Sequence, residues 1–210
     1  MRIELNKISK KIKNQEILKD ISYVFEGGKI YGIMGHNGSG KTMLLRAISG
    51  LINIDHGYIK IDEKVLHKDI DFPESLGIII ENPSFFSYYT GFENLKFLSN
   101  IKKKATDEDI KRSLEKVGLD VNDKRTVSKY SLGMKQKLAV AQAIMEEPKM
   151  LFLDEPINAL DDESIKKFKK IINDEKKKGA CILIATHNKA LLEDDIDEYI
   201  YLNDGKMKEV

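Results

Sequence analysis

The sequence predicts an α/β protein with a mostly parallel sheet, an antiparallel β-subdomain and a helical insert. Short apolar runs typical of buried strands alternate with helical patterns in much of the chain. Residues 2–25 instead alternate apolar and polar side chains in two stretches, which is typical of an antiparallel hairpin. Between about residues 84 and 146 helical patterns dominate, and this indicates an insert.

The individual elements follow from periodicity and from their end signals. The expected strands cover residues 3–8, 17–25, 30–34, 57–62, 76–80, 150–153, 181–185, 198–202 and 207–210. The expected helices cover residues 43–48, 93–101, 107–117 and 162–178, with a further helical pattern from Ser131 to Met145. Gly50, Gly118 and Gly179 are expected helix ends, and Thr106 is an expected N-cap.

Composition limits the class of protein. The chain has 210 residues, 33% charged and 41% apolar, with a formal net charge of +1. This length suits one large domain, and the balanced charge creates no global field that would attract nucleic acid or an anionic membrane. No apolar run approaches the roughly 20 residues of a membrane span, and the N-terminus lacks the pattern of a signal peptide. The lone Cys181, in an apolar run, is interpreted as a core residue rather than a nucleophile.

A glycine-rich loop joins the strand expected at 30–34 to the helix expected at 43–48. It consists of Gly35, His36, Asn37, Gly38, Ser39, Gly40, Lys41 and Thr42, and it fits the phosphate-binding pattern G-x-x-x-x-G-K-[ST]. Glycines let backbone N–H groups point at phosphate oxygens, and the N-terminus of the helix, beginning near Met43, adds partial positive charge. Lys41 can reach the β- and γ-phosphates, and the Thr42 hydroxyl can bind Mg²⁺.

Two adjacent carboxylates follow a later apolar strand. Asp154 and Glu155 end the run that begins at Met150 and precede Pro156. Ligands of parallel sheets sit at the carboxyl ends of the strands, so this strand should place both acids beside the phosphate loop. We expect Asp154 to orient Mg²⁺ and Glu155 to polarise the attacking water.

A third segment completes a family resemblance. Ser131-Leu132-Gly133-Met134-Lys135-Gln136 stands before the strand that carries Asp154 and Glu155. A phosphate loop, an S-x-G-x-x-Q segment and an L-D-E-P segment in that order resemble an ATP-binding-cassette (ABC) ATPase over essentially the whole chain. The usual signature of that family is LSGGQ. Ser131 and Gly133 match its two functional positions, whereas Leu132 and Met134 depart from it.

The resemblance implies a head-to-tail dimer with two ATP molecules held between the phosphate loop of one copy and the signature helix of the other. Ser131 and Gly133 would act in trans, since a serine and a bare glycine backbone at a helix N-terminus form an anion site. Capping of its own helix by Ser131 is compatible with this role. This chain contains both the phosphate-loop half and the signature half of such a site, so a second copy of this chain is the expected partner.

Two further positions resemble family motifs. Ala159-Leu160-Asp161 resembles the D-loop of the dimer interface, although Asp161 could serve only as the N-cap of the next helix. His187 follows the last buried strand and resembles the switch histidine that contacts the γ-phosphate. A histidine at a strand end can also be purely structural.

Glu81 stands where the family usually has a glutamine that binds Mg²⁺ and whose loop meets the permease. A carboxylate could bind the metal with a full charge, but it adds negative charge beside a triphosphate, so its role stays open. Together with the signature segment, this Glu81 variant resembles the subfamily of bacitracin and lantibiotic exporters. Antimicrobial peptide export is the substrate class that this resemblance implies.

The function implied is ATP hydrolysis that powers a separately encoded membrane permease on the inner face of the cell membrane. One ABC ATPase domain would span residues 1–210: a RecA-like core and β-subdomain (1–83 and 147–210) and a helical subdomain (about 84–146). The aromatic segment 85–89 is either partly core or part of a groove for a coupling helix of the permease.

Two other classes remain as alternatives. A non-transport cassette protein that acts on ribosomes would usually carry two cassettes in one chain. A cassette protein that acts on DNA would usually carry a long coiled coil between the phosphate loop and the signature segment. No sustained heptads separate Thr42 from Ser131. A P-loop kinase or GTPase would lack the segment 131–136.

Ile12 leads to a prediction about nucleotide choice. The family often stacks adenine on an aromatic residue of the first hairpin turn, and Ile12 occupies that position here. A branched aliphatic residue covers a base without π-stacking, so we predict modest affinity and a preference for ATP over GTP of only a few-fold. Competition binding measures this preference. A ratio above about a hundredfold, about 2.7 kcal/mol, would contradict the prediction.

Overall fold

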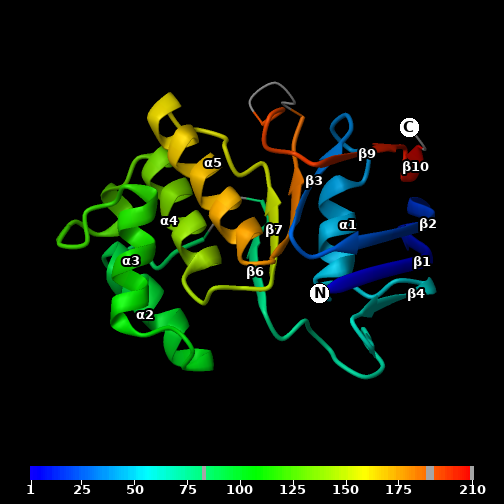
Figure 1. Cartoon of the computed structure of the whole chain (residues 1–210), viewed down its shortest axis with the longest axis horizontal. Coiled ribbons are helices and arrows are strands. Elements are labelled where there is room, and N and C mark those ends of the chain that lie inside the picture. The colour runs from blue at the N-terminus through cyan, green and yellow to red at the C-terminus, as the bar shows by residue number, and fades with distance from the viewer. Residues whose placement is uncertain (82–83, 188–191, 209–210) are drawn as a thin grey trace.

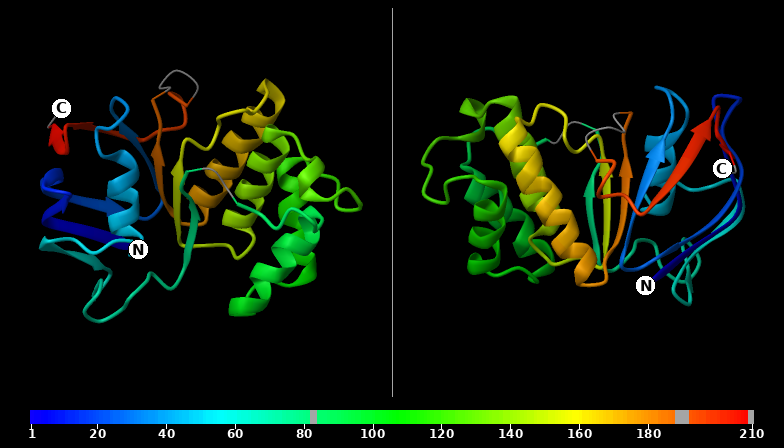
Figure 2. Two further views of the ribbon diagram at one scale, coloured as in Figure 1. Left: turned by 180° about the vertical axis from the view of Figure 1, so that it is seen from behind. Right: turned by 45° about the horizontal axis from the view of Figure 1, so that its top comes forward.

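The computed structural model describes residues 1–81, 84–187 and 192–208 and contains two sheets with helices between and beside them. Helix α1 (Lys41–Ile48) lies between the two sheets, whereas α2, α3, α4 and α5 lie on the other side of the larger sheet (Figure 1). Both views of Figure 2 show the same layers. The outer helices are α2 (Gly91–Lys102), α3 (Asp107–Val117), α4 (Leu132–Ile144) and α5 (Asp162–Lys177).

The strands form an antiparallel sheet and a mostly parallel one. The smaller sheet has the order β2-β1-β4-β5, with β1 (Arg2–Ile12), β2 (Gln15–Glu26), β4 (His56–Ile61) and β5 (Lys64–Val65). The larger sheet has the order β10-β9-β3-β8-β7-β6, with β3 (Lys29–Met34), β6 (Leu76–Ile79), β7 (Met150–Asp154), β8 (Cys181–Ala185), β9 (Glu198–Asn203) and β10 (Lys206–Lys208). Among the described strand pairs of the larger sheet, β9–β10 is antiparallel and the others are parallel.

Most expected elements are confirmed, with shifted ends. Helix α3 has the expected bounds, because Thr106 accepts from the backbone of Asp109 in a capping box and Gly118 ends the helix at φ +75°. Helix α2 begins two residues earlier than expected, because Thr90 forms a second capping box. The first hairpin turn is shorter than expected, with only Lys13 and Asn14 between the strands. The last expected strand is β10, and residues 209–210 lie outside the described ranges.

The central parallel strands β3, β7 and β8 are buried on both faces and divide the core in two. Along β3, β7 and β8 successive side chains enter opposite cores, as the pleat of a strand requires. Ile30 packs with the outer helices, whereas its neighbour Tyr31 packs with α1 and the smaller sheet. Leu151 and Phe152 alternate in the same way. The sheet therefore has α1 on one face and α3, α4 and α5 on the other. The carboxyl ends of its parallel strands lead into loops.

Cys181 is fully buried in β8, as the sequence predicts. Within the described ranges, no helix is long and apolar enough to cross a membrane.

We predict that native Cys181 resists thiol reagents. Burial raises the pKa of its thiol to about 12. Against an ordinary cysteine, this lowers the thiolate fraction at neutral pH by more than about a thousandfold, and the thiolate is the reacting species. Kinetics of labelling with a chromogenic disulfide measure this, with the protein in guanidinium chloride as the fast-reacting control. Rapid labelling of the folded protein would show that the thiol is accessible and the prediction wrong.

Candidate nucleotide site

The glycine-rich loop leads from the end of β3 to the start of α1 and is held in shape by its own lysine. Lys41 Nζ donates to the backbone carbonyl oxygens of Gly35 at 2.7 Å and His36 at 3.0 Å. Gly40, the N-cap of α1, has φ +107°, a conformation that a residue with a Cβ adopts only with strain. Ser39 is buried against Gly35. The loop therefore leads directly into the N-terminus of α1, where the first N–H groups of a helix have no partner within the helix itself.

Thr42 and Asp154 meet at the carboxyl edge of the larger sheet. Thr42 Oγ1 donates to Asp154 Oδ2 at 2.6 Å, although β8 lies between β3 and β7. The contact is made across the sheet edge by the first turn of α1. A hydroxyl and a carboxylate oxygen at this separation fit a hard cation such as Mg²⁺. Among the described residues no group of three or more His, Cys, Asp or Glu side chains could hold a metal, so other ligands would have to complete this pair.

The surroundings of Asp154 have opposing effects on the pKa of its carboxyl group. Burial raises the pKa of Asp154, and the hydrogen bond from Thr42 lowers it. The charges of Glu155 and Glu81 also raise this pKa, whereas the charge of Lys41 lowers it. The three carboxylates are therefore close enough to repel, and a cation among them would relieve that repulsion.

The Glu155 carboxylate is held by the residues that follow β8. Thr186 Oγ1 donates to Glu155 Oε2 at 3.1 Å, and the His187 backbone N–H donates to Oε1 at 3.1 Å. His187 Nδ1 lies 2.6 Å from the same Oε1. The structure thus brings Glu155 and His187, each expected separately to act in the site, into direct contact. Thr186 is a contact that sequence reasoning missed, although its place beside His187 was a signal for it.

A cavity of about 350 Å³ joins these groups. Its lining comprises Ile17, Asn37, Gly38, Gly40, Lys41, Thr42, Met43, Asp154 and Glu155. Ile17 of β2 is the apolar wall of this cavity and was not predicted. Ile12, the expected base contact, lies at the end of β1, is 40% exposed and is not among the lining residues. The alternation of the β2 residues, which placed Ile17 in a strand, could have pointed to it.

Glu81 follows β6 and pairs with a residue of α1. Arg46 Nη2 donates to Glu81 Oε1 at 2.8 Å. Glu81 has φ +57°, so a non-glycine residue stands in the left-handed region at the point where the chain leaves the sheet. Arg46 lies one helical turn after Thr42, so helical spacing could have placed it on the same side of α1.

The signature residues lie outside this cavity. Ser131 is the N-cap of α4 and accepts from the Met134 backbone N–H at 3.2 Å. Gly133 lies in the first turn of α4, and neither residue lines the cavity. Asp161 is the N-cap of α5 and accepts from the Ser164 N–H at 2.8 Å, one of the two roles considered for it. Ser131 and Asp161 therefore both stand at helix N-termini away from the phosphate loop of their own chain.

Comparison with known proteins gives consistent results. The family model described as ABC transporter matches residues 18–158. The uncharacterized ABC transporter ATP-binding protein YybJ of Bacillus subtilis is 50% identical over 98% of this chain and 94% of its own length. The bacitracin transport ATP-binding protein BcrA of Enterococcus faecalis is 34% identical over 99% of this chain and 68% of its own. The lantibiotic transport ATP-binding protein SrtF of Streptococcus pyogenes is 31% identical over 98% and 88%.

Solved structures agree with these relatives. An ATP-binding subunit of an ABC transporter matches with a TM-score of 0.89 and 27% identity over 100% of this chain and 89% of that one. The dimeric cassette MJ0796 in a post-hydrolysis state with ADP and Pi matches in fold, with a TM-score of 0.85 and 21% identity over 99% and 97%. These matches favour a transport ATPase over the ribosome, nucleic-acid, kinase and GTPase alternatives. The chain belongs to the ABC transporter family, as an ATP-binding subunit that hydrolyses ATP.

Proposed function

We propose that Glu155 polarises the water that attacks ATP and that His187 senses the γ-phosphate. The observation that carries this proposal is the 2.6 Å contact between His187 Nδ1 and Glu155 Oε1 at the wall of the phosphate-loop cavity. A carboxylate already held by three donors keeps its orientation as it accepts a proton from water. His187 is more than half exposed and can turn toward a phosphate that enters the cavity.

The phosphate loop would bind the triphosphate. Its N–H groups and the N-terminus of α1 favour anions, and Lys41 would exchange its two carbonyl partners for β- and γ-phosphate oxygens. Thr42 and Asp154 would hold Mg²⁺, which neutralises the charge of the triphosphate. Glu81 would contribute a third oxygen only after it parts from Arg46, so its contact with the metal stays open.

A second copy of this chain would complete the site. Ser131 and Gly133 present a helix N-terminus that does not line the cavity of their own chain, as a site that acts in trans requires. Asp161, at the N-terminus of α5, would lie at the same interface. ATP would close the two copies, and hydrolysis would let them open. Residues 1–83 and 147–210 would form the core and β-subdomain, and about 84–146 the helical subdomain.

The membrane partner would be a separately encoded permease, which keeps the chain on the inner face of the cell membrane. The helical segment offers an exposed aromatic cluster: the Phe86 ring lies 5.9 Å from Tyr89 and 5.4 Å from Phe97, centroid to centroid. Each of these three side chains is more than 40% exposed. Exposed aromatic groups of this kind anchor protein interfaces.

An antimicrobial peptide, moved outward, is the substrate class suggested by the names of BcrA and SrtF.

The Glu155→Gln variant tests the catalytic assignment. It should bind ATP and dimerise but hydrolyse ATP at least about a hundredfold more slowly, because an amide cannot accept the proton of the attacking water. Phosphate release and size-exclusion chromatography with ATP measure the two effects. The control is Glu163→Gln on α5, whose exposed carboxylate pairs with Lys167 and should be dispensable. Hydrolysis by Glu155→Gln at the wild-type rate would show that its assigned role is wrong.

Capture of partners tests the transporter proposal. Tagged Glu155→Gln protein at native expression should co-purify with a stoichiometric multi-span membrane protein when membranes are solubilised in mild detergent with ATP. Ribosomes, nucleic acid or a soluble complex in place of a membrane protein would contradict the proposal.

A further inference from the structure

Helix α4 is joined to the segment after Glu155 by a buried side-chain amide. Gln136 is 8% exposed, and its Nε2 donates to the backbone carbonyl oxygen of Pro156 at 2.9 Å. Pro156 is itself buried and directly follows Glu155. A buried carbonyl needs a hydrogen-bond partner, and this side chain supplies one from a different element.

The segment that Gln136 contacts has unfavourable backbone conformations. Glu155 has φ +46° and Ala159 has φ +63°, both in the left-handed region that non-glycine residues rarely adopt. Such conformations persist only where the surrounding structure holds them. The carboxylate of Glu155 is held by Thr186 and His187, and its backbone N–H donates to the Ala185 carbonyl oxygen at 2.8 Å, so these contacts all come from the end of β8. The peptide that follows, at Pro156, is supported from the opposite side, by α4.

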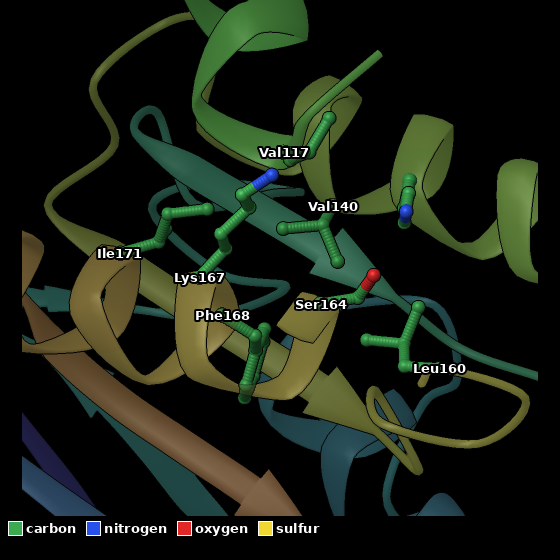
Figure 3. A pocket seen from close by; sticks show the side chains of 8 residues that line it. Val117, Val140, Leu160, Ser164, Lys167, Phe168 and Ile171 are labelled. Carbon is green, nitrogen blue, oxygen red and sulfur yellow. The ribbon is translucent and has the colours of Figure 1, made fainter. Parts of the chain in front are cut away.

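Helix α4 supports the segment from Pro156 to Leu160 at several points. A Cβ on Gly133 would lie 2.7 Å from the Ala159 carbonyl oxygen, so helix and segment are in tight contact there. Farther along, Val140 of α4 and Leu160 line one cavity of about 10 Å³, room for about one water molecule (Figure 3). Gln136 lies between Gly133 and Val140 along α4, and its side chain forms the hydrogen bond from the helix to Pro156.

We propose that Gln136 is a positioning residue for Glu155. Its amide holds the Pro156 carbonyl and thereby the backbone turn that aims the Glu155 carboxylate into the cavity. Because Ser131 and Gly133 begin the same helix, occupation of the partner's site would be transmitted through α4 to this chain's own Glu155. This inference rests on the proposed role of Glu155 and assigns a function to a residue that makes no contact with the cavity.

Gln136→Met tests the proposal. Methionine has nearly the same length and volume but no N–H donor. We expect kcat for ATP hydrolysis to fall about tenfold to a hundredfold, because small displacements of a catalytic group have effects of this size. The KM for ATP and the affinity for ATP should stay within about twofold, because Gln136 does not touch the cavity. An unchanged kcat, or a loss confined to KM, would overturn the proposal.

The matched control is Gln142→Met, a substitution of the same kind on the same helix. Gln142 is only partly buried, and kcat of this variant should remain that of the wild type. Thermal unfolding of both variants reports folding. If Gln136→Met does not fold, Gln136→Leu removes the donor with a shorter apolar side chain. It should show the same drop in kcat, and a wild-type kcat would overturn the proposal.

The double variant Gln136→Met/Glu155→Gln separates this inference from the function on which it rests. If Gln136 acts through Glu155, its substitution should lower the residual rate of Glu155→Gln by less than about threefold. A further loss as large as that in the wild-type background would show that Gln136 acts independently, and would overturn the inference alone. Wild-type hydrolysis by Glu155→Gln itself would instead refute the role of Glu155.

Discussion

The hydrogen bond between Thr42 and Asp154, 2.6 Å long, joins the two halves of the candidate nucleotide site, and it depends on how the helices and sheets are packed. Thr42 belongs to the first turn of α1, and Asp154 ends β7, with β8 between their strands. The contact requires α1 to lie flat against one face of the larger sheet. That position depends in turn on the smaller sheet, which covers the other side of α1 with the apolar residues of β1 and β2.

Some of the residues with unfavourable backbone conformations lie at the edge of the larger sheet where the site is built. Glu81, Glu155 and Ala159 all have positive φ, and each such conformation costs on the order of 1 kcal/mol or more. All three lie directly after strands of the larger sheet or in the segment that follows one. The ordered strands and helix α4 hold these residues in place, so side chains are aimed across the sheet edge before any nucleotide enters. Such pre-organisation is what transition-state stabilisation demands.

Sequence patterns identified most of the contacting residues, because the chemistry lies in short segments. The phosphate loop, the two acids after β7 and the histidine after β8 could each be placed at a strand end from local periodicity alone. The rule that ligands lie at the carboxyl ends of parallel strands also placed Asp154 beside the phosphate loop, but two other contacts between distant segments were not predicted. Arg46 and Glu81 are 35 residues apart and Gln136 and Pro156 are 20 apart, and each pair is joined by a single hydrogen bond that leaves no periodic signal.

The sequence by itself determined the fold class, the membership in the ABC transporter family and the identity of the groups at the strand ends, because buried strands, helix caps and glycine turns are local consequences of residue type. Tertiary structure decided which of these groups meet. It placed Ile17 rather than Ile12 in the lining of the cavity, because Leu18 of β2 points into the core beside α1 and its neighbour Ile17 points to the opposite face of the strand. It also paired Glu155 with Thr186 and His187, because β7 and β8 are adjacent and parallel and their ends therefore lie side by side.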